Sequence, residues 1–133
     1  MRAALEERRS EDGDLYDDIL IEYRHPETGG SIMPTLSAAM QLLRPGVATA
    51  GHRHTHSVVY HVVEGRGTSV VGSRRLDWSK GDTFVVPIWA AHRHLNSSAA
   101  DALLFSFTDA PVVEALGLAR TEPVVSPDLD LAL

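Results

Sequence analysis

Two stretches of the chain decide its fold, GVATAGHRHTHSVVYHVVEG at residues 46–65 and GDTFVVPIWAAHRHLN at residues 81–96. In the first, one residue separates His52 from His54, so a strand places both side chains on the same face. In the second, the apolar run 83–87 predicts a buried strand that ends at Pro87, because proline cannot donate to a ladder. His92 follows this run. If the two stretches meet in one small barrel, their three imidazoles converge on a single metal ion.

The ligand chemistry of such a site is restricted by composition. The chain has no cysteine, so disulfides, thiolate catalysis and thiolate metal ligands are excluded. Neutral imidazole is the commonest protein ligand for Zn, Cu, Fe and Ni, and three imidazoles leave positions free for water, substrate or dioxygen. An open site of this kind suits catalysis more than structure. We predict one divalent metal ion held by His52, His54 and His92, with Fe(II) favoured over Mn, Ni or Zn.

Both stretches resemble the two signature motifs of the cupin superfamily, glycine for glycine and histidine for histidine. Two positions depart from the motifs: Val58 stands where many cupins have a glutamate ligand, and Trp89 stands where glycine is usual. The resemblance implies an all-β fold, a single jelly-roll β-barrel, with a ligand set of three histidines.

The surrounding sequence, over roughly residues 23–122, is similar to the gentisate 1,2-dioxygenase family. The similarity rests on Pro34-Thr35-Leu36, Tyr60-His61-Val62-Val63-Glu64-Gly65, Trp78-Ser79-Lys80-Gly81-Asp82 and Asp109-Ala110-Pro111. That family has two barrels per chain and ring-cleaving Fe(II) in the N-terminal one, whereas this sequence looks more like the C-terminal barrel, which often lacks metal. The catalytic barrel holds the substrate carboxylate with an arginine at the position of Tyr60. The resemblance therefore implies that gentisate is a poor substrate here.

Length and charge exclude several classes of protein. A chain of 133 residues fits one domain. The net charge of −6 argues against nucleic-acid binding, which needs a basic surface. The first eight residues contain no apolar signal region, and nowhere do eighteen apolar residues run together. We expect a cytoplasmic protein that does not bind membranes.

The order of elements predicts an N-terminal arm at 1–18, a cupin domain at 19–122 and a C-terminal tail at 123–133. Short runs with Gly, Pro and Asn between them predict strands near 36–43, 49–54, 58–63, 68–72, 83–86, 92–95 and 102–108. Residues 110–117 predict one short helix with Asp109 as N-cap. The leading strand, Ile19 to Tyr23, is one that an isolated barrel need not pair. Because exposed strand edges are usually covered, we expect a homodimer.

Further site residues follow from their spacing. His94 shares the face of His92, which suggests a general acid or base. Tyr60 and Trp89 are candidates for an apolar wall of the substrate pocket, and His56 and Val58 for its mouth. For each of them the alternative is a packing or surface role.

The function that we predict is a ring-cleaving dioxygenase that acts on a small hydroxylated aromatic or enol with dioxygen. Two alternatives remain open. A non-redox isomerase, cyclase or lyase would use the metal as a Lewis acid, with His94 as its base. A non-catalytic module would use the same barrel only to bind a small ligand.

Overall fold

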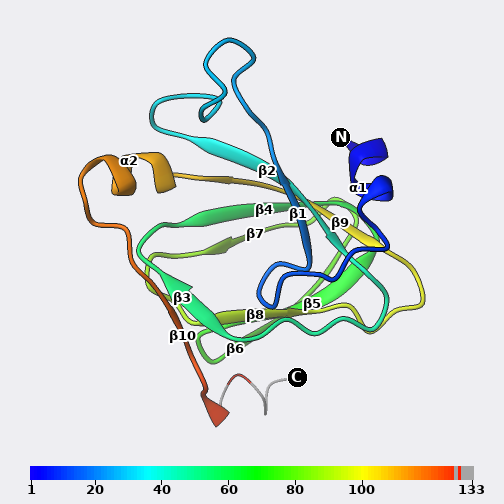
Figure 1. Cartoon of the computed structure of the whole chain (residues 1–133). Helices are drawn as coiled ribbons and strands as arrows, with labels where there is room; N and C mark the ends of the chain where they lie inside the picture. The colour runs from blue at the N-terminus through cyan, green and yellow to red at the C-terminus, as the bar shows by residue number, and fades with distance from the viewer. Residues whose placement is uncertain (128, 130–133) are drawn as a thin grey trace.

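The computed structural model describes residues 1–127 and 129, which form two antiparallel five-stranded sheets that face each other (Figure 1). The first sheet has the order β1-β2-β9-β4-β7, with β1 at Ile19–Glu22, β2 at Ser37–Leu43, β9 at Ala102–Thr108, β4 at Val58–Glu64 and β7 at Thr83–Val86. The second has the order β10-β3-β8-β5-β6, with β10 at Thr121–Pro123, β3 at His52–His54, β8 at His92–Leu95, β5 at Arg66–Val71 and β6 at Arg74–Ser79. The sheets do not join into one closed sheet, but the predicted all-β class is confirmed.

Two strands were not predicted from the sequence. Gly72 adopts a positive φ of 63° and turns the chain back, so that β6 pairs with β5 along its whole length. The last strand, β10, pairs with β3. The predicted tail at 123–133 begins inside β10, and residues 128 and 130–133 lie outside the described part of the chain.

The main core lies between the sheets. It is built from Leu43, Val58, Tyr60, Val62, Trp78, Val86, Ala102 and Leu104, with Phe84 packed against it. Strand β4 shows why: Val58, Tyr60 and Val62 are buried, whereas the alternate residues are more exposed, as the period of two requires. Gly65 ends β4 with a φ of 86°, and a Cβ there would lie 2.5 Å from the carbonyl oxygen of Asp101. Only glycine fits this turn.

A second, smaller core covers the outer face of the first sheet. The short helix α1, Arg2–Glu7, buries Leu5 against Ile19, Leu42 and Leu103. Figure 1 shows α1 beside β1 and β9. The segment predicted as an N-terminal arm at 1–18 therefore begins with a helix that is packed against the sheet.

The leading strand has a partner within the chain, contrary to the expectation that it would be left unpaired. β1 pairs antiparallel with β2, from Ile19 opposite Leu42 to Glu22 opposite Ala39. The alternation in β1 explains the pairing, because Ile19 and Ile21 pack in the outer core while Leu20 and Glu22 face the interior. The argument for a dimer from an unpaired β1 is therefore wrong.

The predicted helix is present as α2, Ala110–Ala115. Asp109 precedes it, but its side chain makes no capping bond; its Oδ1 instead accepts the backbone N–H of Ser57 at 2.9 Å. This bond connects α2 to the turn between β3 and β4. Among the described residues, no helix is long and apolar enough to cross a membrane.

Candidate metal centre

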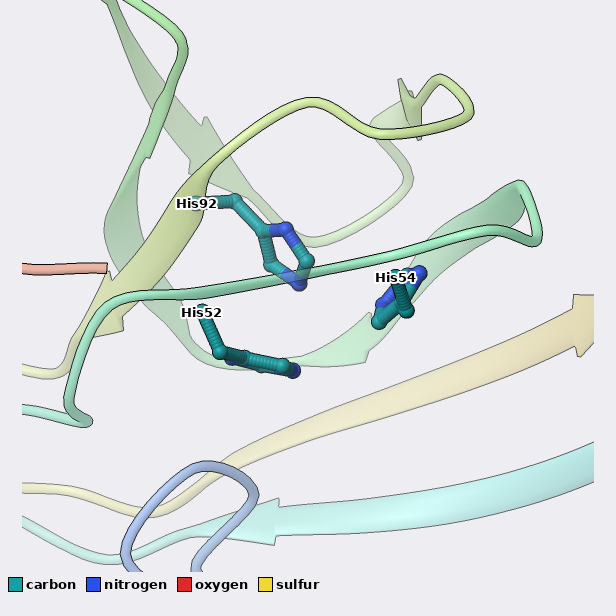
Figure 2. A group of neighbouring side chains, drawn as sticks. All are labelled: His52, His54 and His92. Atoms are coloured by element: carbon teal, nitrogen blue, oxygen red, sulfur yellow. The ribbon is translucent and has the colours of Figure 1, made fainter. Parts of the chain in front are cut away.

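The three predicted ligands come together on the inner face of the second sheet. His52 in β3 lies directly opposite His92 in β8, and His54 lies two residues further along β3 on the same face. One nitrogen from each of the three rings lies within 4.8 Å of the others, and Figure 2 shows the side chains pointing toward one another. The sheet register therefore creates the cluster, because neighbouring strands bring opposed side chains to about 5 Å.

Backbone carbonyls set the orientation of two of these rings. The Nδ1 of His54 lies 2.9 Å from the carbonyl oxygen of His56, and the Nδ1 of His92 lies 2.9 Å from that of Ala90. Since a carbonyl only accepts, each Nδ1 carries the proton and each Nε2 offers a lone pair. The Nε2 of His92 is buried and has no hydrogen-bond partner. Metal-binding histidines are held in this way, with the second nitrogen donating to a fixed acceptor.

The electrostatics keep the triad in the form that binds metal. Burial lowers the pKa of His52 to about 4 and that of His92 to about 2, and it also lowers the pKa of His54. Neighbouring imidazoles lower the pKa of His52 and His92 further. All three rings are therefore neutral at pH 7, as coordination requires. The donor set fits a divalent transition metal.

A cavity of about 430 Å³ opens in front of the triad, within the size range of small-molecule sites. His52 and His54 line it, as do three of the four predicted pocket residues, His56, Val58 and Tyr60. The ring of His56 stacks on that of His54, with 3.8 Å between centroids. The cavity thus joins the metal cluster to the apolar interior between the sheets.

Trp89, the fourth predicted pocket residue, is not among the residues that line this cavity. Trp89 has a positive φ of 61°, and its ring lies 4.4 Å from the guanidinium carbon of Arg53 and 5.4 Å from that of Arg120. These distances are typical of cation–π contacts. The alternation along β3 explains the position, because Arg53 points away from the face that carries the histidines.

His94 is fully buried and also does not line the cavity. Its Nδ1 lies 2.6 Å from the Oγ of Ser69, which accepts the indole N–H of Trp78 at 2.9 Å. Because the indole can only donate, the Ser69 hydroxyl is free to donate to His94, which then holds its proton on Nε2. Burial lowers the pKa of His94 to about 3. His94 therefore lies behind the triad as a neutral ring, 5.8 Å from His92 between centroids.

Comparison with known proteins places the chain in a family. The sequence model of the Cupin domain matches residues 39–108, more than half of the chain. The chain is a cupin. Residues 39–108 contain both histidine stretches and every strand from β3 to β9, so the match includes the whole metal cluster.

The relatives of this cupin include aromatic-ring dioxygenases. It is 46% identical to a 5-aminosalicylate 1,2-dioxygenase of Comamonas, over 96% of this chain and 34% of the relative, and 40% identical to a gentisate 1,2-dioxygenase of Streptomyces, over 76% and 28%. The crystal structure of the salicylate 1,2-dioxygenase of Pseudaminobacter salicylatoxidans superposes with a TM-score of 0.79 at 35% identity, over 92% of this chain and 34% of that one. The predicted resemblance is confirmed. The chain spans about one third of the length of these relatives.

The sequence analysis missed the residues that the N-terminal segment of this cupin adds to the cavity. Tyr16 and Asp17, assigned to the arm, both line it, and the ring of Tyr16 lies 4.7 Å from that of His52 between centroids. A bridge between Asp14 and Asp18 forms the loop that carries them. The acidic residues around Tyr16 were the only feature of the sequence that could have indicated a functional loop. The neighbouring residues do not show which strands such a loop covers.

Proposed function

We propose that this cupin is an Fe(II)-dependent oxygenase that cleaves the ring of a small hydroxylated aromatic, or the equivalent bond of an enol, with dioxygen. The observation that carries the proposal is a cluster of three neutral imidazoles, two of which, His52 and His54, line the wall of a 430 Å³ cavity. The names of the relatives, which include dioxygenases for gentisate and 5-aminosalicylate, support the reaction class. Because the chain matches only about a third of each relative, the activity is a proposal for this chain.

The residues of the chain have separate tasks in this proposal. His52, His54 and His92 hold the ion, and the carbonyls of His56 and Ala90 fix two of these rings. Fe(II), when bound, supplies a centre that brings substrate and dioxygen together and passes electrons between them.

The rest of the cavity binds the substrate. Val58 adds no carboxylate to the ligand set, and Tyr60 offers the substrate a wall and a phenolic hydroxyl that burial keeps protonated by raising its pKa. Both atoms of dioxygen enter the product as one carbon–carbon bond breaks, so the substrate supplies all the electrons. His94 lies behind His92 as a neutral ring and does not line the cavity, so in this proposal it supports the triad and is not the acid or base that contacts the substrate.

The test is oxygen uptake by protein reconstituted with Fe(II) under argon and then exposed to air with a panel of phenols and enols. We expect uptake with an ortho- or para-hydroxylated compound and a ring-opened product that contains both oxygen atoms when ¹⁸O₂ is used. Gentisate should react slowly, because Tyr60 has no charge to bind its carboxylate, and Tyr60→Arg should speed its turnover. Rapid turnover of gentisate by the unmodified protein would contradict the argument from Tyr60.

The same assay separates the two alternatives. Equal conversion of a substrate under argon would identify an isomerase, cyclase or lyase. Metal binding without oxygen uptake across the panel would leave a ligand-binding module.

We further propose that the protein is a homodimer, on a different surface from the one suggested by the sequence. The outer face of the first sheet exposes Val85 and Phe107 on either side of Val59, which is paired with both in the sheet. Val63, on the same face of β4, is 39% exposed. A second copy is the occupant proposed, since an apolar sheet face of this kind is usually buried in an interface.

Light scattering at micromolar concentration tests the dimer. We expect twice the mass of one chain, and the mass of one chain for the Val85→Glu variant, because a carboxylate would be buried unpaired in the interface. Leu116→Glu, which changes an exposed apolar residue next to α2, is the control and should remain dimeric. A monomeric mass for the unmodified protein would contradict the proposal.

A further inference from the structure

The loop that carries Asp17 is held rigidly over the cavity. The carboxylate of Asp14 accepts the backbone N–H groups of Tyr16 and Asp17 at 2.8 and 3.1 Å. The carbonyl of Leu15 accepts the N–H of Ala50 at 2.9 Å, which fastens the loop to the segment just before β3. On the other side the Nε2 of Gln41 donates to the carbonyl of Asp17 at 2.8 Å. The loop is therefore a fixed wall of the cavity.

The base of this loop is also fixed. Asp18 is buried and forms an ion pair with Arg44, whose Nη2 lies 2.5 Å from its Oδ1. This pairing engages Arg44. Arg8, which also lies near this loop, is engaged by Glu11 and by the carbonyl of Leu20. The neighbouring carboxylate of Asp17 is left to the cavity. Asp17 and Asp18 are adjacent in sequence but have opposite roles, since one is neutralised by a partner and the other is not.

The carboxylate of Asp17 has no hydrogen-bond or ion-pair partner among the described residues. Burial, with the charge of Asp14, raises its pKa to about 6. Asp17 and Tyr60 both line the cavity, and the charge of Asp17 adds to the raised pKa of Tyr60. A desolvated carboxylate without a partner is unfavourable. A donor or a cation brought by a ligand would relieve this cost.

Gln41 provides a second, independent sign of a missing donor. It is fully buried and lines the cavity, and the alternation in β2 places it on the same inward face as Leu43 of the core. Its Nε2 is used by Asp17, but its Oε1 accepts no hydrogen bond. Buried polar atoms without partners are rare in folded proteins. Two acceptors on adjoining parts of the wall thus lack donors.

The charges around the cavity have one sign. Asp14, Asp17, Glu22 and Glu114 line it, and none of the described lining residues is Lys or Arg. Glu22 is neutralised in part by Arg24 at 2.8 Å and by a hydrogen bond from Ser37. Asp14 is occupied by the backbone of its own loop. Glu114 is exposed to solvent, whereas Asp17 is partly buried, so Asp17 is the less solvated carboxylate left to act on a ligand.

We propose that the cavity selects a hydroxylated aromatic with a positively charged nitrogen substituent, its hydroxyl groups at the histidine triad and its ammonium group at Asp17. This inference rests on the proposed function only in one respect, that the aromatic ring of the ligand lies at the histidine triad. An ammonium group supplies three donors and a charge, which match the carboxylate of Asp17 and the nearby Oε1 of Gln41. A carboxylate substituent in the same place would be repelled.

The experiment compares three catechols whose one further substituent is positive, neutral or negative: 3,4-dihydroxybenzylamine, 4-methylcatechol and 3,4-dihydroxybenzoate. Each offers the metal the same pair of hydroxyls, so differences in affinity report the substituent. Binding to the Zn(II)-loaded protein is measured by calorimetry under argon at pH 7.5, where no oxidation occurs. We expect the amine to bind at least tenfold more tightly than the carboxylate, with methylcatechol between them.

Two variants assign the effect. Asp17→Asn should weaken binding of the amine by fivefold or more and change binding of methylcatechol by less than twofold. Glu27→Gln removes the same charge at an exposed position outside the cavity and should change neither.

Three outcomes would overturn the inference: equal or tighter binding of the carboxylate, an equal effect of Asp17→Asn on all three ligands, or no binding of any. Failure of the proposed function is read separately, as absence of oxygen uptake. A module that binds the amine without oxidising it would keep this inference and refute that function.

Discussion

Replacing His52 or His54 by alanine should lower the affinity for Fe(II) or Zn(II) by roughly 100-fold or more, because losing a ligand should exceed the 10–100-fold effect of losing a ligand's hydrogen-bond partner. Either variant leaves only two of the three nitrogens that lie within 4.8 Å of one another. With no cysteine in the chain, no thiolate can replace the lost ligand. Metal content after anaerobic reconstitution and competition with a chelator measures the effect.

The control is His61→Ala. This histidine is exposed on the outer face of β4, where its Nδ1 lies 2.9 Å from the hydroxyl of Thr83. Metal affinity should be unchanged in this variant. One equivalent of metal is expected in the unmodified protein. If His52→Ala and His54→Ala bound metal as tightly as His61→Ala while all three remained folded, the triad would not be the metal site.

Acid should strongly destabilise the metal-free protein. Burial lowers the pKa of His92 to about 2 and that of His94 to about 3, whereas unfolded histidine titrates near 6.5. Below pH 6.5 the unfolded chain therefore takes up protons that the folded chain does not. Each of these two imidazoles should lower the free energy of unfolding by about 1.4 kcal/mol per pH unit as the pH falls below about 6.5. Above about pH 6.5 these two imidazoles no longer change the free energy of unfolding with pH.

Urea unfolding at pH 7.5, 6 and 5 measures this loss, which should appear as a steady fall in the midpoint. Asp17 acts in the opposite direction, because its raised pKa of about 6 favours the folded state on acidification, but it is one group against several histidines. The fall of the urea midpoint with decreasing pH should be unchanged in His61→Gln and smaller in His94→Asn. A midpoint that does not change between pH 7.5 and pH 5 would contradict the burial of these rings.

The sequence predicted the part of the site that depends on strand periodicity. The spacing of His52 and His54 fixes their common face in any strand, and the cluster follows once β3 pairs with β8, which carries His92. The bounds of β7, β8 and β9 agree with the prediction. In these strands the pattern of apolar and polar residues is visible within a few neighbouring positions. Such a pattern can be recognised without knowing which strands pair.

The remaining parts depend on contacts between distant residues. Trp89 lies at a motif position that suggested the pocket, but its positive φ and the stacking of Arg53 place it outside the cavity. Asp17 belongs to a loop whose position is set by bonds to Gln41 and to the segment just before β3. Neither the backbone turn nor these partners can be read from the residues around them.

The pairing of β3 has a consequence for the time at which the site can form. β3 is three residues long and shares a single paired position with β8, while its other edge is covered by β10. Arg53 in β3 and Glu122 in β10, which form an ion pair, are 69 residues apart in sequence. Contacts over such separations form late, because the intervening chain must first be ordered. On a ribosome, the histidines of β3 would thus be synthesised long before the strand that fixes them, and metal capture belongs to the last stage of folding.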